Sequence, residues 1–275
     1  MFECVINLSE GRDAARLAAF EHAAGVSFVN RHSDPVHHRS VFTLLGPADQ
    51  LVSDTRRLLR DALATLDLTA HEGVHPRFGV ADVVPFVPLN GATMDDAVAL
   101  RNDTARWLAS DEGVGCFLYG PDTLHGFSTL PEVRARARHG GEPDVPSATR
   151  DPRRGYAAVG AREVLMAWNV WLEDSSVTVA KELATAIRSA SVRALGLDLG
   201  GATQVSCNLI GPATTGPLEV LRRVEQLLAG RGRVARCELV GLAPASVLDA
   251  LTAGEREACG LDPARTIEAA VAAKY

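Results

Sequence analysis

Two rhythms of apolar and polar residues run along the chain, and together they predict a mixed α and β protein. Period-two alternation and short apolar runs predict strands at 3–8, 26–30, 39–45, 80–87, 114–119, 163–172, 192–197, 203–210 and 234–240. A period near 3.6 predicts helices from the turn at 9–12 to about 25, over 47–66, 93–110, 175–187 and 217–228, and in the C-terminal tail.

The pattern changes between 131 and 155. This segment contains the pair Gly140-Gly141 and four prolines, at 131, 143, 146 and 152. Long regular elements are not expected there, because proline removes a backbone donor and glycine frees the backbone. We therefore predict that the segment forms the boundary between two α/β halves.

The composition is that of an ordinary globular chain of 275 residues, with 47% apolar and 23% charged side chains. These fractions exclude wholesale disorder, collagen and coiled coil. A net charge of −6 argues against a general nucleic-acid binder. Five scattered cysteines without metal-ligand spacing are typical of a reducing cytosol. With no secretory leader and no run of 18 apolar residues, we expect a cytoplasmic protein without a membrane span.

One predicted strand carries polar residues on one face. Gln204, Ser206 and Asn208 alternate with apolar neighbours, and Asn169 lies among apolar residues in an earlier strand. A buried amide without a partner costs about 1–3 kcal/mol, so these side chains need polar surroundings. Two interpretations remain open, a solvent-facing sheet surface and a wet cleft lined by the sheet.

The densest group of reactive side chains is His71, His75, Arg77 and Asp82, in a segment punctuated by glycine and proline. A loop imidazole titrates near neutral pH and transfers protons, and a carboxylate such as Asp82 can set its tautomer. The group indicates either a general acid/base site or a set of structural and surface side chains.

A second cluster at 32–39 contains His32, His37 and His38, so five of the eight histidines fall in two loops. The letters HEGVH at 71–75 match a zinc motif, but that motif needs a helix to bring both imidazoles to one face. We therefore predict no metal site. Glycine-rich phosphate loops and nucleophile elbows are also missing.

The irregular segment and its start carry positive charge in a chain that is acidic as a whole. The arginines are Arg134, Arg136, Arg138, Arg150, Arg153 and Arg154. Such a patch attracts an anionic small molecule through carboxylate pairing, or it is a solvated arginine-rich loop.

Taken in order, eight segments of the chain resemble the formiminotransferase domain family, whose members include glutamate formimidoyltransferase. The longest is HEGVHPRFGVADVVPFVP at 71–88. The others are NLSEGR at 7–12, HRSVFT at 38–43, TMDD at 93–96, VGAR at 159–162, Trp168-Asn169, QVSCNL at 204–209 and LVGLAP at 239–244.

The resemblance implies an α+β fold of two α/β subdomains, at 1–161 and 162–275, with mixed sheets packed together, helices on the outside and a folate-binding groove between the subdomains. It implies transfer of a formimino group from N-formimino-L-glutamate to tetrahydrofolate, as part of histidine catabolism, usually by a homodimer.

The resemblance also implies roles for individual residues. The catalytic histidine of the family falls on His75, and the folate-binding positions fall on Pro152, Arg154 and Gly155. The substrate-binding positions that we expect are Asn7, Arg12, His32, His38, Arg39, Arg77, Asp82, Asn169, Gln204 and Asn208.

Several departures from the family pattern lie close to the predicted chemistry. Val74 stands where the family usually has Glu, His32 where it has an acidic residue, and His38 where it has Asn. An aromatic position of the folate loop falls on Arg154, and a usual proline falls on Ile6. Loss of a partner carboxylate changes the pKa and the role of a histidine.

Our leading hypothesis is a folate-dependent formimino transferase in which His75 is the general acid/base. One alternative is a diverged enzyme that acts on another amidine or amide without folate. The other is a non-catalytic protein that binds folate or a small anion. Partners other than small molecules and a second copy of the chain, such as nucleic acid or a membrane, are not expected.

Overall fold

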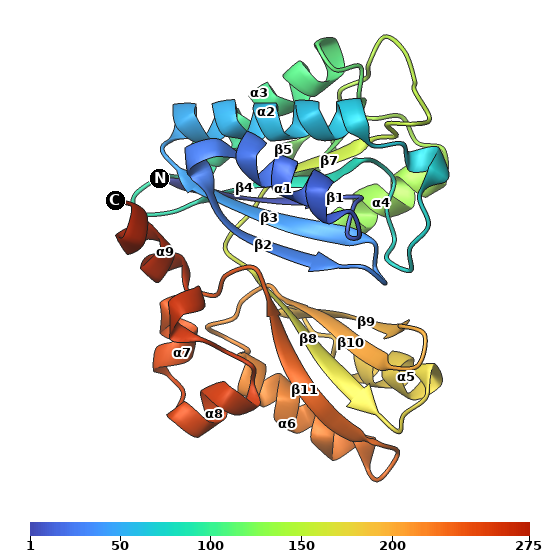
Figure 1. The fold of residues 1–275 in the computed structure, drawn as a ribbon, viewed down its shortest axis with the longest axis vertical. Helices are drawn as coiled ribbons and strands as arrows, with labels where there is room; N and C mark the ends of the chain where they lie inside the picture. The colour runs from blue at the N-terminus through green and yellow to red at the C-terminus, as the bar shows by residue number, and fades with distance from the viewer. The chain divides into compact units, whose positions relative to one another are not determined.

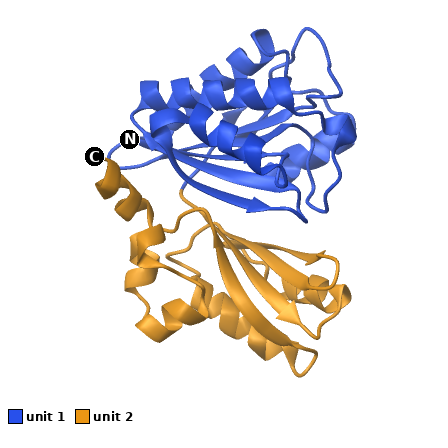
Figure 2. Cartoon of the chain, in the orientation of Figure 1, with its two compact units in different colours: residues 1–163 blue, residues 164–275 orange.

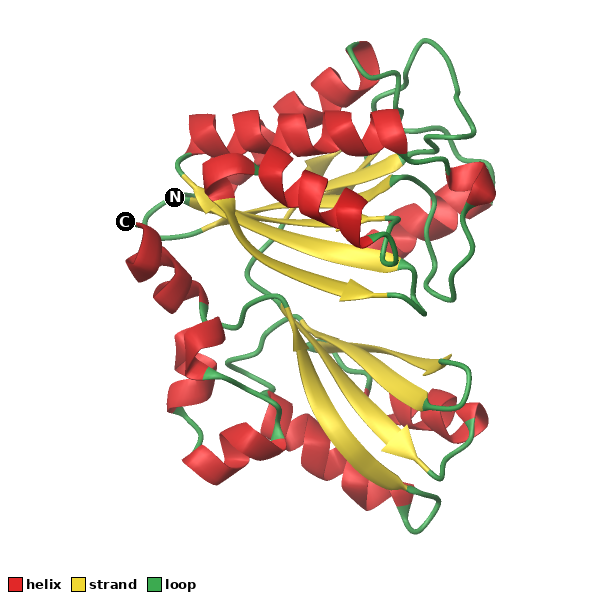
Figure 3. Ribbon diagram, in the orientation of Figure 1, coloured by secondary structure: helices red, strands yellow, loops and turns green.

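A computed structural model describes all 275 residues, which form nine α-helices and eleven strands. The chain divides into two compact units, unit 1 (Met1–Glu163) and unit 2 (Val164–Tyr275), each with its own sheet and core (Figure 2). Helices and strands are distributed over both units, which confirms the predicted α+β class (Figure 3). No helix combines the length and the apolar character that a membrane crossing requires.

Unit 1 is built on a seven-stranded mixed sheet with the order β2-β3-β1-β4-β7-β5-β6. The pairs β4–β7 and β5–β7 are parallel and the remaining pairs are antiparallel. Its strands are β1 (Phe2–Leu8), β2 (Phe28–Asp34), β3 (Arg39–Gly46), β4 (Ala81–Pro88), β5 (Cys116–Thr123), β6 (Gly126–Ser128) and β7 (Ala157–Ala161).

Helices α1 (Ala14–Ala23), α2 (Ala48–Thr65) and α3 (Met94–Ser110) lie on one face of this sheet (Figure 1). Their apolar sides form one core with the inward side chains of β1 and β3. Helix α4 (Leu130–Arg138) packs elsewhere, through Val133, in a smaller cluster with residues of β4, β5 and β7. Two 3₁₀ turns, Gly25–Ser27 and Leu68–Ala70, complete the unit.

Unit 2 has a four-stranded antiparallel sheet of order β11-β8-β10-β9, covered on one face by two helices. The strands are β8 (Met166–Glu173), β9 (Val192–Asp198), β10 (Thr203–Leu209) and β11 (Arg233–Val240). The helices are α5 (Val177–Ile187), α6 (Pro217–Leu228), α7 (Ala245–Asp249), α8 (Ala253–Ala258) and α9 (Ile267–Lys274), with a 3₁₀ turn at Pro263–Arg265.

The structure corrects the interpretation of 131–155. This segment lies inside unit 1, where it does not separate the units, and it begins with helix α4. Thr129 and Glu132 form a capping box and Pro131 lies in the first turn, where a proline fits a helix because no intrahelical donor is needed. Here proline marks the beginning of a helix.

Strand β7 is also absent from the prediction. Its sequence AAVGA has no polar alternation, and all five residues are buried between β4 and β5. A side chain on Gly160 would lie 2.1 Å from the ring of Tyr119, so a small residue is required there. Pairing with two neighbours stabilises this short strand where its own propensity does not.

Candidate active site

The loop that carries His75 connects the 3₁₀ turn Leu68–Ala70 to strand β4. Arg77 holds this loop from inside. Its Nη1 donates to the carbonyls of Gly73 (3.0 Å) and His75 (2.8 Å), and its Nη2 donates to the carbonyl of His71 (3.3 Å). Arg77 was predicted to bind a carboxylate, but in the structure its two terminal nitrogens donate to backbone carbonyls of the loop.

A second segment supports the loop from the C-terminal side of unit 1. Tyr156 donates its backbone N–H to the carbonyl of Phe78 (2.9 Å), and Val80 donates to the carbonyl of Arg154 (2.9 Å). The two backbones approach so closely that a Cβ on Gly79 would lie 1.7 Å from the carbonyl oxygen of Tyr156. Gly155 has φ +70°, a conformation that favours glycine. Glycines at both positions make this approach possible.

His75 lies at the centre of a positively charged site. Its Nδ1 is 2.8 Å from the carbonyl of Pro76, and its Nε2 is 2.6 Å from Nη1 of Arg39. A carbonyl only accepts, so Nδ1 carries the proton and Nε2 holds a lone pair. Burial, followed by the charges of Arg39, Arg134 and His37, holds the pKa of His75 well below its usual range. His75 is therefore a neutral imidazole at neutral pH, as a general base must be.

Asp82 has no hydrogen bond to the imidazole of His75 and instead contacts residues next to it. Its Oδ1 accepts the backbone N–H of Phe78 (2.9 Å), and its Oδ2 forms an ion pair with Arg134 of α4. Arg134 also donates to the carbonyl of Pro76 (3.1 Å), the same oxygen that holds His75. The tautomer of His75 is thus set by the Pro76 carbonyl. Asp82 does not contact the imidazole; it holds the backbone of Phe78 and the guanidinium of Arg134.

The predicted residues of β1, β2 and β3 share one face of the unit 1 sheet. Asn7 and His32 are both paired with Val41, and Arg39 lies two residues before Val41 on β3. Residues paired directly across neighbouring strands point to the same face, and so do residues two apart in one strand. Asn7 donates from Nδ2 to the carbonyl of Val5 (3.2 Å). The structure therefore brings Asn7, His32 and Arg39 to a common surface.

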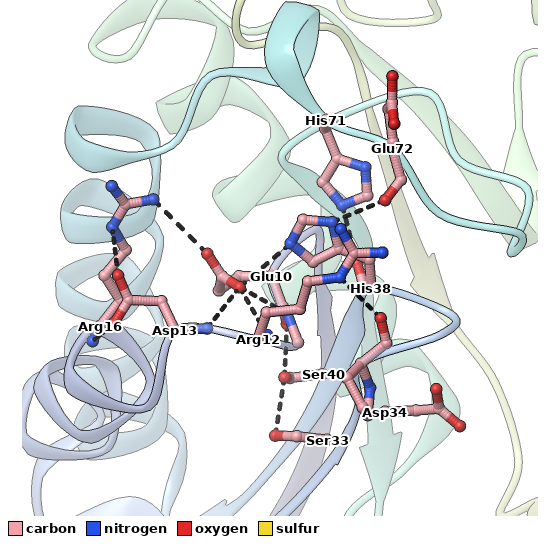
Figure 4. Close-up of polar contacts among 12 residues, drawn as sticks. Glu10, Arg12, Asp13, Arg16, Ser33, Asp34, His38, Ser40, His71 and Glu72 are labelled. Atoms are coloured by element: carbon pink, nitrogen blue, oxygen red, sulfur yellow. Dashed lines mark hydrogen bonds and ion pairs between the residues drawn. The ribbon is translucent and has the colours of Figure 1, made fainter.

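Beside this face, His38 and His71 form a stacked pair, with ring centroids 4.0 Å apart (Figure 4). Nε2 of His38 is 3.2 Å from Oε1 of Glu10, its Nδ1 is 2.8 Å from the carbonyl of Glu72, and Nε2 of His71 is 2.8 Å from the carbonyl of His38. These contacts hold the turn after β2 against the loop of His75. Arg12, predicted to bind substrate, is exposed and donates to the carbonyl of Pro35 (2.8 Å).

Glu10 is the anchor of this pair. Its Oε1 accepts the backbone N–H groups of Gly11 (2.8 Å), Arg12 (2.8 Å) and Asp13 (3.1 Å). Burial alone would raise the pKa of Glu10, but these donors and His38 lower it below the usual value. Sequence reasoning missed Glu10, although the turn signal at 9–12, directly before a helix, was the available indication.

We expect the His38–His71 pair to make the fold sensitive to acid. Burial, with Arg77 and His38 nearby, lowers the pKa of His71, so the unfolded chain takes up its proton at a higher pH than the folded chain. The stability contribution is therefore complete above about pH 6.5 and decreases as the pH falls below it. His71→Gln retains an N–H for the carbonyl of His38 and removes the titration. Chemical denaturation between pH 7.5 and 5 should show a shallower loss in this variant.

The exposed His22 of α1 supplies the control, since His22→Gln should leave the parent's pH dependence unchanged. A pH dependence in His71→Gln as steep as in the parent would contradict the assignment.

A cavity of about 330 Å³ lies next to the loop of His75 in unit 1. Arg138 and Arg150 reach it without any carboxylate partner, and Arg150 lies over the ring of Tyr156, 5.1 Å from the centroid. The lining residues are Leu68, Pro76, Arg77, Phe78, Arg134, Ala137, Arg138, Arg150, Pro152, Gly155 and Tyr156. Two predicted folate residues, Pro152 and Gly155, are among them.

The third predicted folate residue does not line the cavity. Arg154 donates to the backbone carbonyl of Glu112 and lies within ion-pair distance of Glu112 (4.0 Å) and Asp151 (3.9 Å). Its guanidinium is therefore held by its own unit. These contacts give Arg154 a structural role in unit 1, and its predicted role in folate binding stays a prediction.

The three predicted residues of unit 2 lie on the sheet face opposite α5 and α6. Ser206 is paired with Asn169, which donates from Nδ2 to Oε2 of Glu238 (3.3 Å). Asn208 is exposed, whereas Gln204 is 0% exposed and neither polar atom of its amide has a hydrogen-bond partner. The interpretation of this sheet face as a solvent-facing surface therefore does not hold at Gln204.

The histidine cluster can be compared with the side-chain groups that hold metal ions. The stacked His38 and His71 are joined by one carboxylate, Glu10, and no group of three or more His, Cys, Asp or Glu side chains is arranged to hold an ion. All five cysteines are free and buried. For Cys4, Cys116, Cys207, Cys237 and Cys259, burial raises the pKa of the thiol, so none is an activated nucleophile.

The fold and the site together define an α+β protein with a neutral imidazole set among guanidinium groups, an arrangement suited to proton transfer on an anionic ligand. A family model described as the N-terminal subdomain of the formiminotransferase domain matches residues 1–162. The chain belongs to the formiminotransferase family.

Known relatives cover most of the chain. Glutamate formimidoyltransferase of Thermoplasma acidophilum is 32% identical over 278 residues, which span 90% of this chain and 89% of the relative. The protein of the same name from Streptococcus pyogenes serotype M1 is 30% identical over 90% of both chains. Formimidoyltransferase-cyclodeaminase of Sus scrofa is 30% identical over 90% of this chain but only 51% of its own length.

Proposed function

We propose that this protein transfers a formimino group from N-formimino-L-glutamate, or a related amidine, to tetrahydrofolate, with His75 as general acid/base. The observation that carries the proposal is the neutral imidazole of His75, whose Nε2 lone pair faces a cationic site. The names of the relatives supply the group that is transferred.

The cavity beside His75 fits the carboxylate-bearing end of a folate. Arg138 and Arg150 have no carboxylate partner of their own, and Phe78, Pro152 and Tyr156 provide apolar contacts for a flat ligand. Guanidinium groups bind carboxylates through paired hydrogen bonds. Bound tetrahydrofolate supplies the amine nitrogen that accepts the formimino group.

In the proposed reaction His75 moves one proton at Nε2. It takes this proton from the attacking amine and returns it to the glutamate nitrogen, whose bond to the formimino carbon breaks as the new carbon–nitrogen bond forms. The Pro76 carbonyl keeps the ring in the required tautomer, and Arg39 binds a carboxylate of the donor. The net proton count of the protein is unchanged after one turnover.

Further parts of the proposal concern the whole protein. We propose subdomains at 1–161 and 162–275 that both serve the reaction, with Asn7, Arg12, His32, His38, Asn169, Gln204 and Asn208 as substrate-binding residues. We also propose a cytoplasmic homodimer that contributes to histidine catabolism. The buried, unpartnered amide of Gln204 supports a role for unit 2 in ligand binding.

One observation favours a second candidate function. Val74, where an acidic residue would support the histidine, is 46% exposed, and no carboxylate contacts His75. A site of this kind suits hydrolysis of another amidine or amide without folate. The two functions differ in one measurable respect. Transfer releases glutamate from N-formimino-L-glutamate only when tetrahydrofolate is present, whereas hydrolysis releases it without folate.

Calorimetric titration with tetrahydrofolate tests the folate site directly. We expect the double variant Arg138→Ala/Arg150→Ala to bind roughly 2- to 30-fold more weakly than the parent, because two exposed charge pairs are lost. Arg106→Ala, an exposed arginine of α3, is the matched control and should bind like the parent. Absence of binding to the parent at high ligand concentration would exclude the folate-dependent function and favour hydrolysis.

A further inference from the structure

Arg39 lies against the nitrogen of His75 that is needed for chemistry. The Nδ1 proton of His75 is donated to the Pro76 carbonyl, so only Nε2 is available to take a proton from a reactant. Nη1 of Arg39 is 2.6 Å from that nitrogen. The same Nη1 is 3.5 Å from Nδ1, so it lies beside the ring and off the axis of the Nε2 lone pair, and the guanidinium opposes protonation of Nε2 through its charge.

Arg39 has no anionic partner inside the protein. Its side chain hydrogen-bonds only to His75, and no carboxylate lies within ion-pair distance of it. Asp34 and Asp82 act on it only from beyond contact distance, and burial lowers the pKa of Arg39 to about 10. A half-buried guanidinium whose only partner is a neutral ring is poised to exchange that partner for a carboxylate.

The other groups around His75 do not compensate for this charge. Arg134 of α4 faces it and is already paired with Asp82 of β4, while His37, in the turn between β2 and β3, lies with its ring centroid 5.7 Å away. Val74 supplies no carboxylate where the family resemblance implies one. The missing anion has to come from outside the chain.

We infer that the carboxylate of the donor switches His75 on: it binds Arg39, offsets the guanidinium charge beside Nε2, and so allows Nε2 to take the proton of the attacking amine. This inference rests on the proposed function and specifies its substrate class, amidines that carry a carboxylate. The same anion stabilises the imidazolium that forms when His75 is protonated. Uncharged amidines leave the Arg39 charge in place and react slowly.

Nuclear magnetic resonance of ¹⁵N-histidine-labelled protein tests the switch without turnover. The probe is glutarate, with uncharged glutaramide as the control ligand and His75→Ala to assign the signals. We expect saturating glutarate to raise the pKa of His75 by about 1 or more and to change its Nε2 shift, and glutaramide to do neither. Glutarate that fails to bind, or that binds without moving the His75 signals, overturns the inference.

Kinetics provide a second test in which only a gating role gives the expected pattern. N-formimino-L-glutamate is compared with its uncharged diamide, and we expect the parent to prefer the acid by ~10- to 100-fold in kcat/KM. Arg39→Met should remove this preference, lowering turnover of the acid and raising turnover of the diamide. A purely structural arginine would lower both rates equally.

Arg31→Met is the matched control, because Arg31 lies on the neighbouring strand β2 and pairs with Glu21 away from His75. It should keep the parent's preference for the acid. An Arg39→Met variant that still prefers the acid overturns the inference. If neither amidine is turned over by the parent, the proposed function fails, while the glutarate titration still decides whether Arg39 gates His75.

Discussion

His75→Ala is expected to lower kcat for formimino transfer by about 10²- to 10⁴-fold, the range that a positioned general acid/base contributes. The affinity for tetrahydrofolate should change little, since His75 does not line the neighbouring cavity. The side chain hydrogen-bonds only to the Pro76 carbonyl and Arg39, so its removal leaves the fold in place. Initial rates and calorimetric titration on the same preparation separate a loss of chemistry from a loss of binding.

The pH dependence provides a further measurement on the parent. Because the pKa of His75 is held below its usual range, kcat/KM, which reports the free enzyme, should remain on its plateau well below pH 6.5. His22→Ala, a change on the exposed side of α1, is the control for both experiments. Unchanged turnover in His75→Ala, with activity demonstrated for the parent, would remove His75 from the mechanism.

Periodic sequence allowed most elements to be predicted. Helices α2 and α3 have long apolar faces and α6 begins with proline, and all three lie within a residue or two of the predicted ranges. Strand β2 extends to Asp34, into residues predicted as a loop, because pairing with β3 outweighs their polar character. Short elements stabilised mainly by their neighbours, such as α4 and β7, carry too little pattern of their own.

The sequence proposed the residues of the candidate site, but it did not predict which of them lie together. Glycine and proline around His75 marked the loop correctly, whereas the partners of its ring come from other elements: Arg39 from β3 and Arg134 from α4. The role of a guanidinium depends on what the fold places beside it. Arg77 donates to backbone carbonyls and Arg154 donates to the carbonyl of Glu112, contacts that the sequence did not indicate.

We expect the ion pair between Asp82 and Arg134 to be a main support of the loop that carries His75. Asp82 is only 1% exposed, and it accepts the Phe78 N–H in addition to the guanidinium. Asp82→Ala leaves a partly buried arginine and a backbone N–H without partners. Removing one member of a buried pair typically costs about 3–5 kcal/mol, and we expect a loss of this size in the free energy of unfolding. Denaturant titration followed by circular dichroism measures it.

Two companion variants decide the cause of that loss. Asp82→Asn keeps an oxygen for the Phe78 N–H and should lose less stability than Asp82→Ala. Asp103→Ala removes a 52% exposed partner from an equivalent pair with Arg56, and should change the free energy of unfolding by no more than about 1 kcal/mol. If Asp82→Ala loses no more than Asp103→Ala, the pair does not support the loop. A large loss of stability in Asp82→Ala would mean that Asp82 acts on His75 indirectly. Asp82 holds Arg134, Arg134 donates to the Pro76 carbonyl, and that carbonyl sets the tautomer of His75.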